Sequence, residues 1–140
     1  MCNHTTTAPA SHFPDARLLL GLMNYRAAQK VALVRPWANA TTQMRCSYQG
    51  VPPIFVSPLQ TLRAVCFAIA FANGTPIGST DTGGFAATLQ AARGADVVYA
   101  GGIDDSVEAE GHDRMSIAWP GNQPQLVKEL AKVGKPLVML

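Results

Sequence analysis

The sequence predicts an α/β domain, with a parallel sheet of about four strands flanked by helices on both faces. From residue 30 onward, short continuous apolar runs alternate with segments of helical periodicity. The runs lack the polar alternation of a half-exposed strand, so both of their faces should be buried, as in a parallel sheet. The length of 140 residues, with 48% hydrophobic and 14% charged residues, suits one folded domain rather than a disordered chain or a coiled coil.

The elements follow one another in a regular order. The expected strands are the apolar runs Val31 to Val34, Phe67 to Phe71, Asp96 to Ala100 and Leu137 to Leu140. The expected helices are Ser57 to about Val65, Phe85 to Arg93 and Gln123 to Val133. Ser57 and Pro58 suit an N-cap followed by a first helical residue, and Gly94 and Gly134 suit helix ends.

The first 29 residues form a separate segment, which we expect to be irregular or partly helical. Met1 to about Ala16 is polar and contains two prolines, whereas Leu18 to Gln29 is compatible with a helix. The chain thus divides into residues 1–29 and a domain over residues 30–140. Because Leu140 falls inside an expected strand, we also expect the sequence to be part of a longer protein.

Charge and hydropathy exclude some partners. The eleven Lys and Arg residues are scattered singly and the net charge is only +2, so we expect no nucleic-acid partner. The longest apolar run, Ala64 to Ala72, has nine residues, about half of what a membrane-spanning helix needs. Asp15 and Arg17 precede the short run Leu18 to Leu20, so no signal peptide is visible in this chain.

The three cysteines, Cys2, Cys46 and Cys66, are an odd number without metal-ligand spacing. They indicate free thiols rather than a disulfide framework or a zinc site. No cofactor motif was found, so we expect neither a metal nor a cofactor.

The strongest candidate site is an acidic loop directly after the third expected strand. Five of the nine acidic residues fall within ten positions, together with a histidine and an arginine: Asp104, Asp105, Glu108, Glu110, His112, Asp113 and Arg114. The carboxyl ends of parallel strands are where ligands bind, and Gly101 and Gly102 allow the chain to turn there. A solvated acidic loop is the alternative. A calcium site is a third interpretation, although the spacing of an EF-hand loop is absent.

The loop could also supply a general acid. A carboxyl group that stays protonated near neutral pH can donate a proton, and retaining glycoside hydrolysis needs a second carboxylate about 5 Å away. Glu108 and Glu110 are two positions apart, so they would point in opposite directions in an extended loop. Only one of them should therefore act.

Several blocks resemble one protein family. The blocks GGID, EAEGHDR and WPGNQ, with RPWANATTQM and YQGVPPIFVSPLQ upstream, resemble the C-terminal α/β sandwich domain of glycoside hydrolase family 3, and most of all its fungal β-xylosidase branch. The resemblance runs from about Lys30 to Leu140. It implies a partial sandwich domain belonging to a retaining enzyme that cleaves terminal β-linked xylose from xylo-oligosaccharides. A (β/α)8 barrel of the longer protein would supply the nucleophile, so the isolated chain should be inactive.

The resemblance also implies roles for individual residues. Glu108 matches the general acid/base, with Glu110 as the second choice. Independently of the resemblance, Asp113 and Arg114 adjoin this loop, and we expect them to hold it in shape through an ion pair. The alternative function is a non-catalytic α/β module that binds sugar or a protein through the same loop, or an inactive fragment.

Some positions depart from the family pattern or allow two interpretations. Arg35 stands where the family usually has glycine, and it should either perturb the turn after the first strand or lie exposed at the surface. Arg45 and Cys46 replace residues that are usually small or polar. Trp37 and Trp119 could stack against a sugar ring or pack in the core.

Three triplets match the acceptor pattern for N-linked glycosylation, beginning at Asn3, Asn39 and Asn73. Such triplets suit a secreted glycoprotein. Because family 3 enzymes are largely secreted, the resemblance implies an extracellular parent protein.

Overall fold

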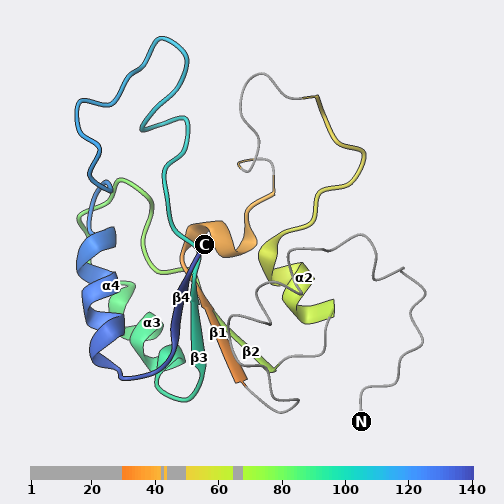
Figure 1. Ribbon diagram of the computed structural model, residues 1–140, viewed down its shortest axis with the longest axis vertical. Helices are drawn as coiled ribbons and strands as arrows, with labels where there is room; N and C mark the ends of the chain where they lie inside the picture. Colours follow the sequence, from red (N-terminus) through yellow and green to blue (C-terminus); the bar gives the residue numbers. More distant parts are fainter. Residues whose placement is uncertain (1–29, 42, 44–49, 65–67) are drawn as a thin grey trace.

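The computed structural model describes residues 30–41, 43, 50–64 and 68–140 (Figure 1). The elements are β1 (Lys30–Val34), η2 (Pro36–Asn39), α2 (Pro58–Ala64), β2 (Ala68–Ala72), α3 (Phe85–Ala92), β3 (Asp96–Tyr99), α4 (Gln123–Lys132) and β4 (Leu137–Met139). The predicted strands and helices from residue 30 onward are confirmed, with ends that differ by about one residue. The short 3-10 helix η2 was not predicted. The helix expected over residues 18–29 lies outside the described residues.

The four strands form one sheet in the order β2-β1-β3-β4, and all neighbours are parallel. The register aligns Val31 of β1 with Ile69 of β2 on one side and with Asp96 of β3 on the other. Because the strands are parallel, their carboxyl ends meet at a single edge, which is the upper end of the sheet near the centre of Figure 1. The predicted parallel sheet is therefore confirmed.

Helices cover both faces of the sheet, as the continuous apolar runs predicted. In β1, Val31 and Leu33 pack in a cluster with Leu59 and Leu62 of α2. The alternate residues of β1 pack on the other face, in a cluster with α3 and α4 that includes Ala32, Val34, Phe85, Leu126 and Leu130. Figure 1 shows α2 on one side of the sheet and α3 with α4 on the other. Because successive side chains of a strand point to opposite faces, β1 contributes residues to two separate hydrophobic clusters.

The start of α2 confirms the predicted N-cap. The backbone N–H of Gln60 donates to Ser57 Oγ (3.2 Å), and the backbone N–H of Ser57 donates to Gln60 Oε1 (2.8 Å). This reciprocal pair is a capping box, which satisfies two backbone donors at the helix start. Pro58 follows as the first helical residue.

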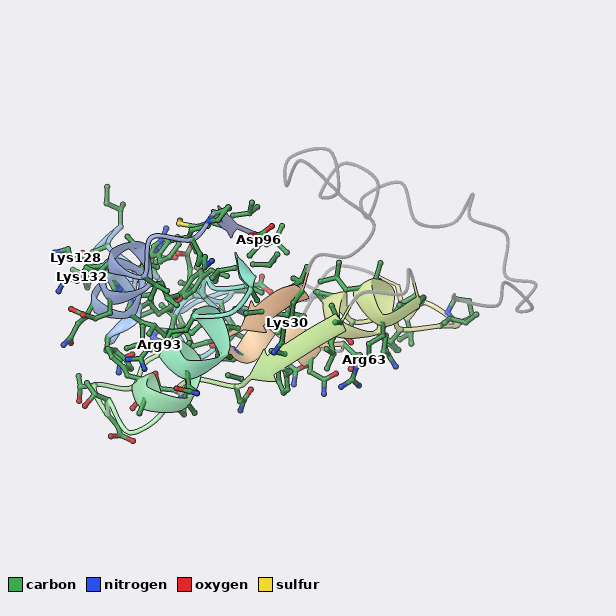
Figure 2. The ribbon with its side chains drawn as sticks, turned by 90° about the horizontal axis from the view of Figure 1, so that it is seen from below. Lys30, Arg63, Arg93, Asp96, Lys128 and Lys132 are labelled. Atoms are coloured by element: carbon green, nitrogen blue, oxygen red, sulfur yellow. The ribbon has the colours of Figure 1, made fainter. Side chains whose placement is uncertain are left out.

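Figure 2 views the molecule from the opposite edge, where the strands begin. Lys30 and Asp96 lie at the starts of β1 and β3, while Arg63 lies away from the group formed by Lys128 and Lys132 on α4. The labelled basic side chains thus come from several elements. Within the described part of the chain, no helix has the length and apolar character required to cross a membrane.

Candidate functional site

The candidate site lies at the carboxyl edge of the sheet, between β1 and β3. After β1 the chain leads to α2 on one face, whereas after β3 it leads to α4 on the other face. The connections that follow these two adjacent strands therefore diverge, which makes this the topological switch point of the sheet. Ligands of open α/β sheets bind in the crevice at such a point. The predicted position of the acidic loop, just after β3, is confirmed.

Two glycines start the loop for different reasons. A Cβ atom on Gly101 would lie 2.2 Å from Cε1 of Tyr99, so any side chain there would collide with the ring. Gly102 has a φ of 141°, a conformation that L side chains rarely adopt. Both positions therefore require glycine, whereas the first turn of the loop comes a few residues later, from Asp105.

The base of the loop is held by the amide of Gln123, which is fully buried. Its Oε1 accepts hydrogen bonds from the backbone N–H of Gly102 (3.0 Å) and from the Tyr99 hydroxyl (3.1 Å). Its Nε2 donates to the carbonyl of Gly102 (2.7 Å) and to that of Ile77 (3.4 Å). The first residue of α4 therefore binds both polar groups of the residue that opens the loop.

Asn122, the residue before Gln123, binds the connection that follows β2. Its Oδ1 accepts a hydrogen bond from Thr75 Oγ1 (2.9 Å), and its side-chain amide donates to the carbonyl of Asp81. Its backbone N–H donates to the carbonyl of Ser79 (2.9 Å). The adjacent residues Asn122 and Gln123 thus tie together the connections that follow β2 and β3.

The loop has regular structure of its own. The carbonyl of Asp104 accepts hydrogen bonds from the backbone N–H groups of Val107 (2.9 Å) and Glu108 (3.1 Å). Ala109 and His112 then pair as an antiparallel bridge, with backbone hydrogen bonds of 3.0 and 2.9 Å. Gly111 is the third residue of the turn that joins them. Its φ of 74° is a conformation that favours glycine. Glu108 therefore sits between a helical turn and a small hairpin.

The structure brings Glu108 and Arg114 together. Arg114 Nε lies 2.7 Å from Glu108 Oε2, and both side chains are partly exposed. The loop thus contains an ion pair, as predicted, but Arg114 forms it with Glu108 and not with Asp113, which is exposed. Glu110 lies exposed in the hairpin turn. Glu108 is therefore the acidic side chain of this loop that the structure fixes by a charged partner.

The position of Arg35 decides between the two alternatives given for it, a perturbed turn after β1 or exposure at the surface. It is fully buried, so the surface-exposed alternative is wrong. Its Nη1 donates to the carbonyl (3.0 Å) and the hydroxyl (2.7 Å) of Thr75, and its guanidinium lies over the ring of Tyr99, 5.7 Å from the centroid. Nε and Nη2 are buried without a hydrogen-bond partner. With φ 93° and ψ 165°, its backbone occupies a region that is almost exclusive to glycine.

Both tryptophans contribute to packing. The ring of Trp119 stacks on that of Tyr99, with centroids 5.9 Å apart and planes inclined by 7°. Trp119 is partly buried against the α3 and α4 core, and Trp37 against the α2 core. These contacts favour the core-packing interpretation of both residues.

The buried position of Tyr99 also affects its ionisation. Burial raises the pKa of the Tyr99 hydroxyl above its ordinary value of 10.0, although the nearby Arg35 guanidinium acts in the opposite direction. The phenol therefore stays protonated at neutral pH and donates a hydrogen bond to Gln123 Oε1.

The candidate glycosylation sites differ in their surroundings. Asn39 and Asn73 are both exposed, and Asn39 Oδ1 accepts a hydrogen bond from Ser57 Oγ (3.2 Å). Asn3, together with Arg45, Cys46 and the other two cysteines, lies outside the described residues.

The described residues offer no metal site at the loop carboxylates, and the hollow at the start of α4 lies apart from them. Among the described residues, no group of three or more His, Cys, Asp or Glu side chains could hold a metal ion. A hollow of about 360 Å³ lies at the start of α4, lined by Thr80, Gly121, Asn122, Pro124, Gln125 and Lys128. The loop carboxylates do not line it, so it is separate from the candidate site.

Sequence reasoning missed the residues that hold the site in place. Gln123, Asn122 and Thr75 are buried and polar, and they were not selected because polar residues in loops and at helix starts are usually exposed. Asn122 and Gln123 directly precede Pro124 at the start of a helix. That placement was a usable signal for the end of the loop, but it did not reveal partners more than 20 residues away.

Comparison with known proteins places this domain in a family. A family model described as the glycosyl hydrolase family 3 C-terminal domain matches residues 19–140. The chain therefore belongs to the family of C-terminal domains of glycoside hydrolase family 3, and the resemblance deduced from its sequence is confirmed. The match begins within the segment of residues 1–29 that we treated separately.

Individual relatives within this family are similar to the chain in sequence and in structure. Exo-1,4-beta-xylosidase xlnD of Aspergillus niger is 53% identical over 113 residues, which is 79% of this chain and 14% of the relative. The solved structure of a family 3 exo-beta-xylosidase, XlnD, in complex with a xylobiose aziridine activity-based probe, has a TM-score of 0.79 at 42% identity, covering 84% of this chain and 16% of that one. A beta-glucosidase from Listeria innocua, at 24% identity, shares the fold with a TM-score of 0.67 over 80% of this chain and 16% of that one. This chain thus spans about one seventh of the length of its relatives.

Proposed function

We propose that this chain is the acid/base-bearing part of a retaining exo-acting β-xylosidase. In this proposal Glu108 first protonates the leaving-group oxygen of the glycosidic bond and then, as a carboxylate, activates the water that completes hydrolysis. The substrate is the terminal β-linked xylose of a xylo-oligosaccharide. The carboxylate nucleophile belongs to a (β/α)8 barrel domain of a longer protein.

The observation that carries the proposal is the position of Glu108. It lies on a loop at the switch point of the sheet, between a turn at Asp104 and the hairpin of Ala109 and His112. Its side chain is accessible, with 44% of its surface exposed, and Arg114 orients it. A general acid must be both reachable by substrate and held in one direction.

The xylosidase names of the relatives support the substrate. The A. niger relative and the XlnD structure both carry the exo-xylosidase name, and the latter was solved with a xylobiose-derived probe. The proposal extends to a secreted, glycosylated parent protein, for which the exposed Asn39 and Asn73 offer acceptor positions.

A chimera tests the role of Glu108. The matched segment of the A. niger exo-1,4-beta-xylosidase is replaced by residues 30–140 of this chain, and hydrolysis is measured on aryl β-xylosides with good and poor leaving groups. In Glu108→Gln, kcat on the poor leaving group should fall by about 10²- to 10⁴-fold, because that oxygen needs a proton to leave. Activity on the good leaving group should fall much less in the first step.

Glu110→Gln is the matched control, because Glu110 lies in the same loop, is exposed and has the same charge. It should leave both activities close to those of the parent chimera. If Glu110→Gln and not Glu108→Gln shows the selective loss, the acid/base is Glu110. Equal activity of Glu108→Gln and the parent on both substrates, or a folded chimera that hydrolyses neither, would overturn the proposal.

A further inference from the structure

Gln123 uses the full hydrogen-bonding capacity of its amide at the base of the acidic loop. Its oxygen has two acceptor positions, which receive Gly102 N–H and the Tyr99 hydroxyl. Its nitrogen has two donors, which are directed at the carbonyls of Gly102 and Ile77. A fully buried and fully satisfied amide of this kind has a single favourable orientation, since any rotation leaves buried polar groups unpaired.

These bonds close the loop at its two ends. Gly102 opens the loop and Gln123 directly follows its last residue, so one side chain joins the start of the loop to the start of α4. The contacts of Glu108 with Asp104 and Arg114 lie within the loop and give it shape. The direction in which the loop leaves the sheet is set at its base, where Gln123 acts.

We propose that Gln123 is a positioning residue that sets the place of Glu108 over the substrate. This inference rests on the proposed function, in which Glu108 is the acid/base. Gln123 does not touch the reacting atoms. It acts through Gly102, and a small change in backbone direction there is carried along the loop to the Glu108 carboxyl.

Two substitutions and a matched control test the inference in the chimera. Gln123→Leu keeps the approximate volume but removes all four hydrogen bonds. We expect kcat to fall by about 10- to 100-fold, as for a catalytic group displaced by about 1 Å, while KM changes little because the fully buried Gln123 side chain does not reach substrate. Gln125→Leu makes the same chemical change on the exposed side of the same helix and should leave kcat unchanged.

Gln123→Glu gives a readout that a general loss of stability would not produce. A protonated carboxyl can accept from Gly102 N–H and the Tyr99 hydroxyl and donate to the Gly102 carbonyl, but an ionised one has no donor. The groups that face this position are the Tyr99 phenol, which stays protonated and neutral in this pH range, and the Arg35 guanidinium, which lies over the Tyr99 ring. The kcat of Gln123→Glu, relative to the parent at each pH, should therefore recover as the pH is lowered, whereas that of Gln123→Leu should not.

Hydrogen exchange of the Gly102 amide measures its hydrogen bond to Gln123 independently of catalysis. It should accelerate in Gln123→Leu and remain slow in Gln125→Leu. A faster exchange with unchanged kcat would overturn the positioning role, as would a Gln123→Glu variant whose relative kcat is the same at every pH. Failure of the proposed function would have a different signature, because Glu108→Gln would keep full activity while the exchange of Gly102 still responded to Gln123.

Discussion

Arg114 Nε donates to Glu108 Oε2 across 2.7 Å, so the ion pair joins the two sides of the hairpin formed by Ala109 and His112. Both partners are partly exposed, with 30% of the Arg114 side chain and 44% of the Glu108 side chain accessible. Water screens a pair of this kind, so its contribution to the free energy of unfolding is small. Its effect is local: it restricts the directions that the Glu108 carboxylate can take.

The first prediction is that loss of the Arg114–Glu108 ion pair changes the conformation of the acidic loop but hardly changes the free energy of unfolding. Arg114→Met should change the free energy of unfolding by less than about 1 kcal/mol, because the pair is solvent-exposed. The same change should shift the backbone amide resonances of residues 108–113, since the hairpin loses its cross-link. Lys132→Met removes a separate ion pair on α4, Lys132–Glu129 at 2.6 Å, and should leave those resonances in place. A loss of several kcal/mol in Arg114→Met would contradict the assignment.

The second prediction concerns the backbone at Arg35. Its φ of 93° and ψ of 165° are nearly exclusive to glycine and cost about 1–3 kcal/mol for other residues. Arg35→Gly should therefore be more stable than Arg35→Ala by about that amount, because the two variants lose the same guanidinium contacts and differ in this strain. Urea unfolding measures the difference.

The comparison with Arg35→Ala isolates the strain, because against the parent chain Arg35→Gly also loses the buried hydrogen bonds from Nη1 to Thr75 and leaves a cavity. Equal stabilities of Arg35→Gly and Arg35→Ala would show that the backbone at this position is not strained.

The third prediction concerns pH. Burial raises the pKa of Tyr99 above 10.0, so in the folded state the phenol holds its proton more tightly than in the unfolded chain. Its contribution to stability is complete below about pH 10 and is lost as the pH rises above that value. Tyr99→Phe should cost about 1 kcal/mol at pH 8 through the lost hydrogen bond to Gln123, and this deficit should shrink or reverse by about pH 11.

The comparison uses unfolding free energies of the parent and Tyr99→Phe at each pH. Tyr25 and Tyr48 are present in both proteins, so their ionisation cancels. A deficit that stays constant from pH 8 to pH 11 would mean that the folded state does not perturb Tyr99.

The fourth prediction compares two glycines without a positive φ. A Cβ on Gly84 would lie 2.2 Å from the carbonyl oxygen of Gly74, whereas a Cβ on Gly94 would meet nothing within 4 Å. Gly84→Ala should therefore destabilise the domain by about 1–3 kcal/mol or more, because the backbone at Gly74 has to move. Gly94→Ala should be neutral or stabilising by up to about 1 kcal/mol. Thermal unfolding of both variants measures the contrast, and similar melting temperatures would argue against the close approach at Gly84.

The strands and helices were predictable because each is encoded by adjacent residues. The run Val31 to Val34 is apolar throughout since both faces of β1 are covered, and Ser57, Pro58 and Gln60 form a local capping pattern at the start of α2. The position of the acidic loop was also predictable, because Gly101 and Gly102 follow β3 directly. In each of these cases, the residues that determine the element lie within a few positions of it in the sequence.

The buried polar contacts were not predictable, because their partners are far apart in the sequence. Thr75 meets Asn122 across 47 positions, and Arg35 meets Thr75 across 40. Arginine is rarely fully buried, so the burial of Arg35 against the ring of Tyr99 runs against the general tendency of its residue type. The ion-pair partner of Arg114 depended on the hairpin, which places Glu108 beside it rather than Asp113.

Arg35 and Gly74 are close neighbours in the fold. A Cβ on Gly74 would lie 3.1 Å from Cδ of Arg35, and Gly74 itself has a φ of 65°. A side chain at position 74 would press on Arg35, which would have to shift by a few tenths of an ångström, and it would also strain the backbone at this positive φ. Replacing Arg35 by a small residue removes the first obstacle and leaves the second, so position 74 favours glycine whatever stands at position 35.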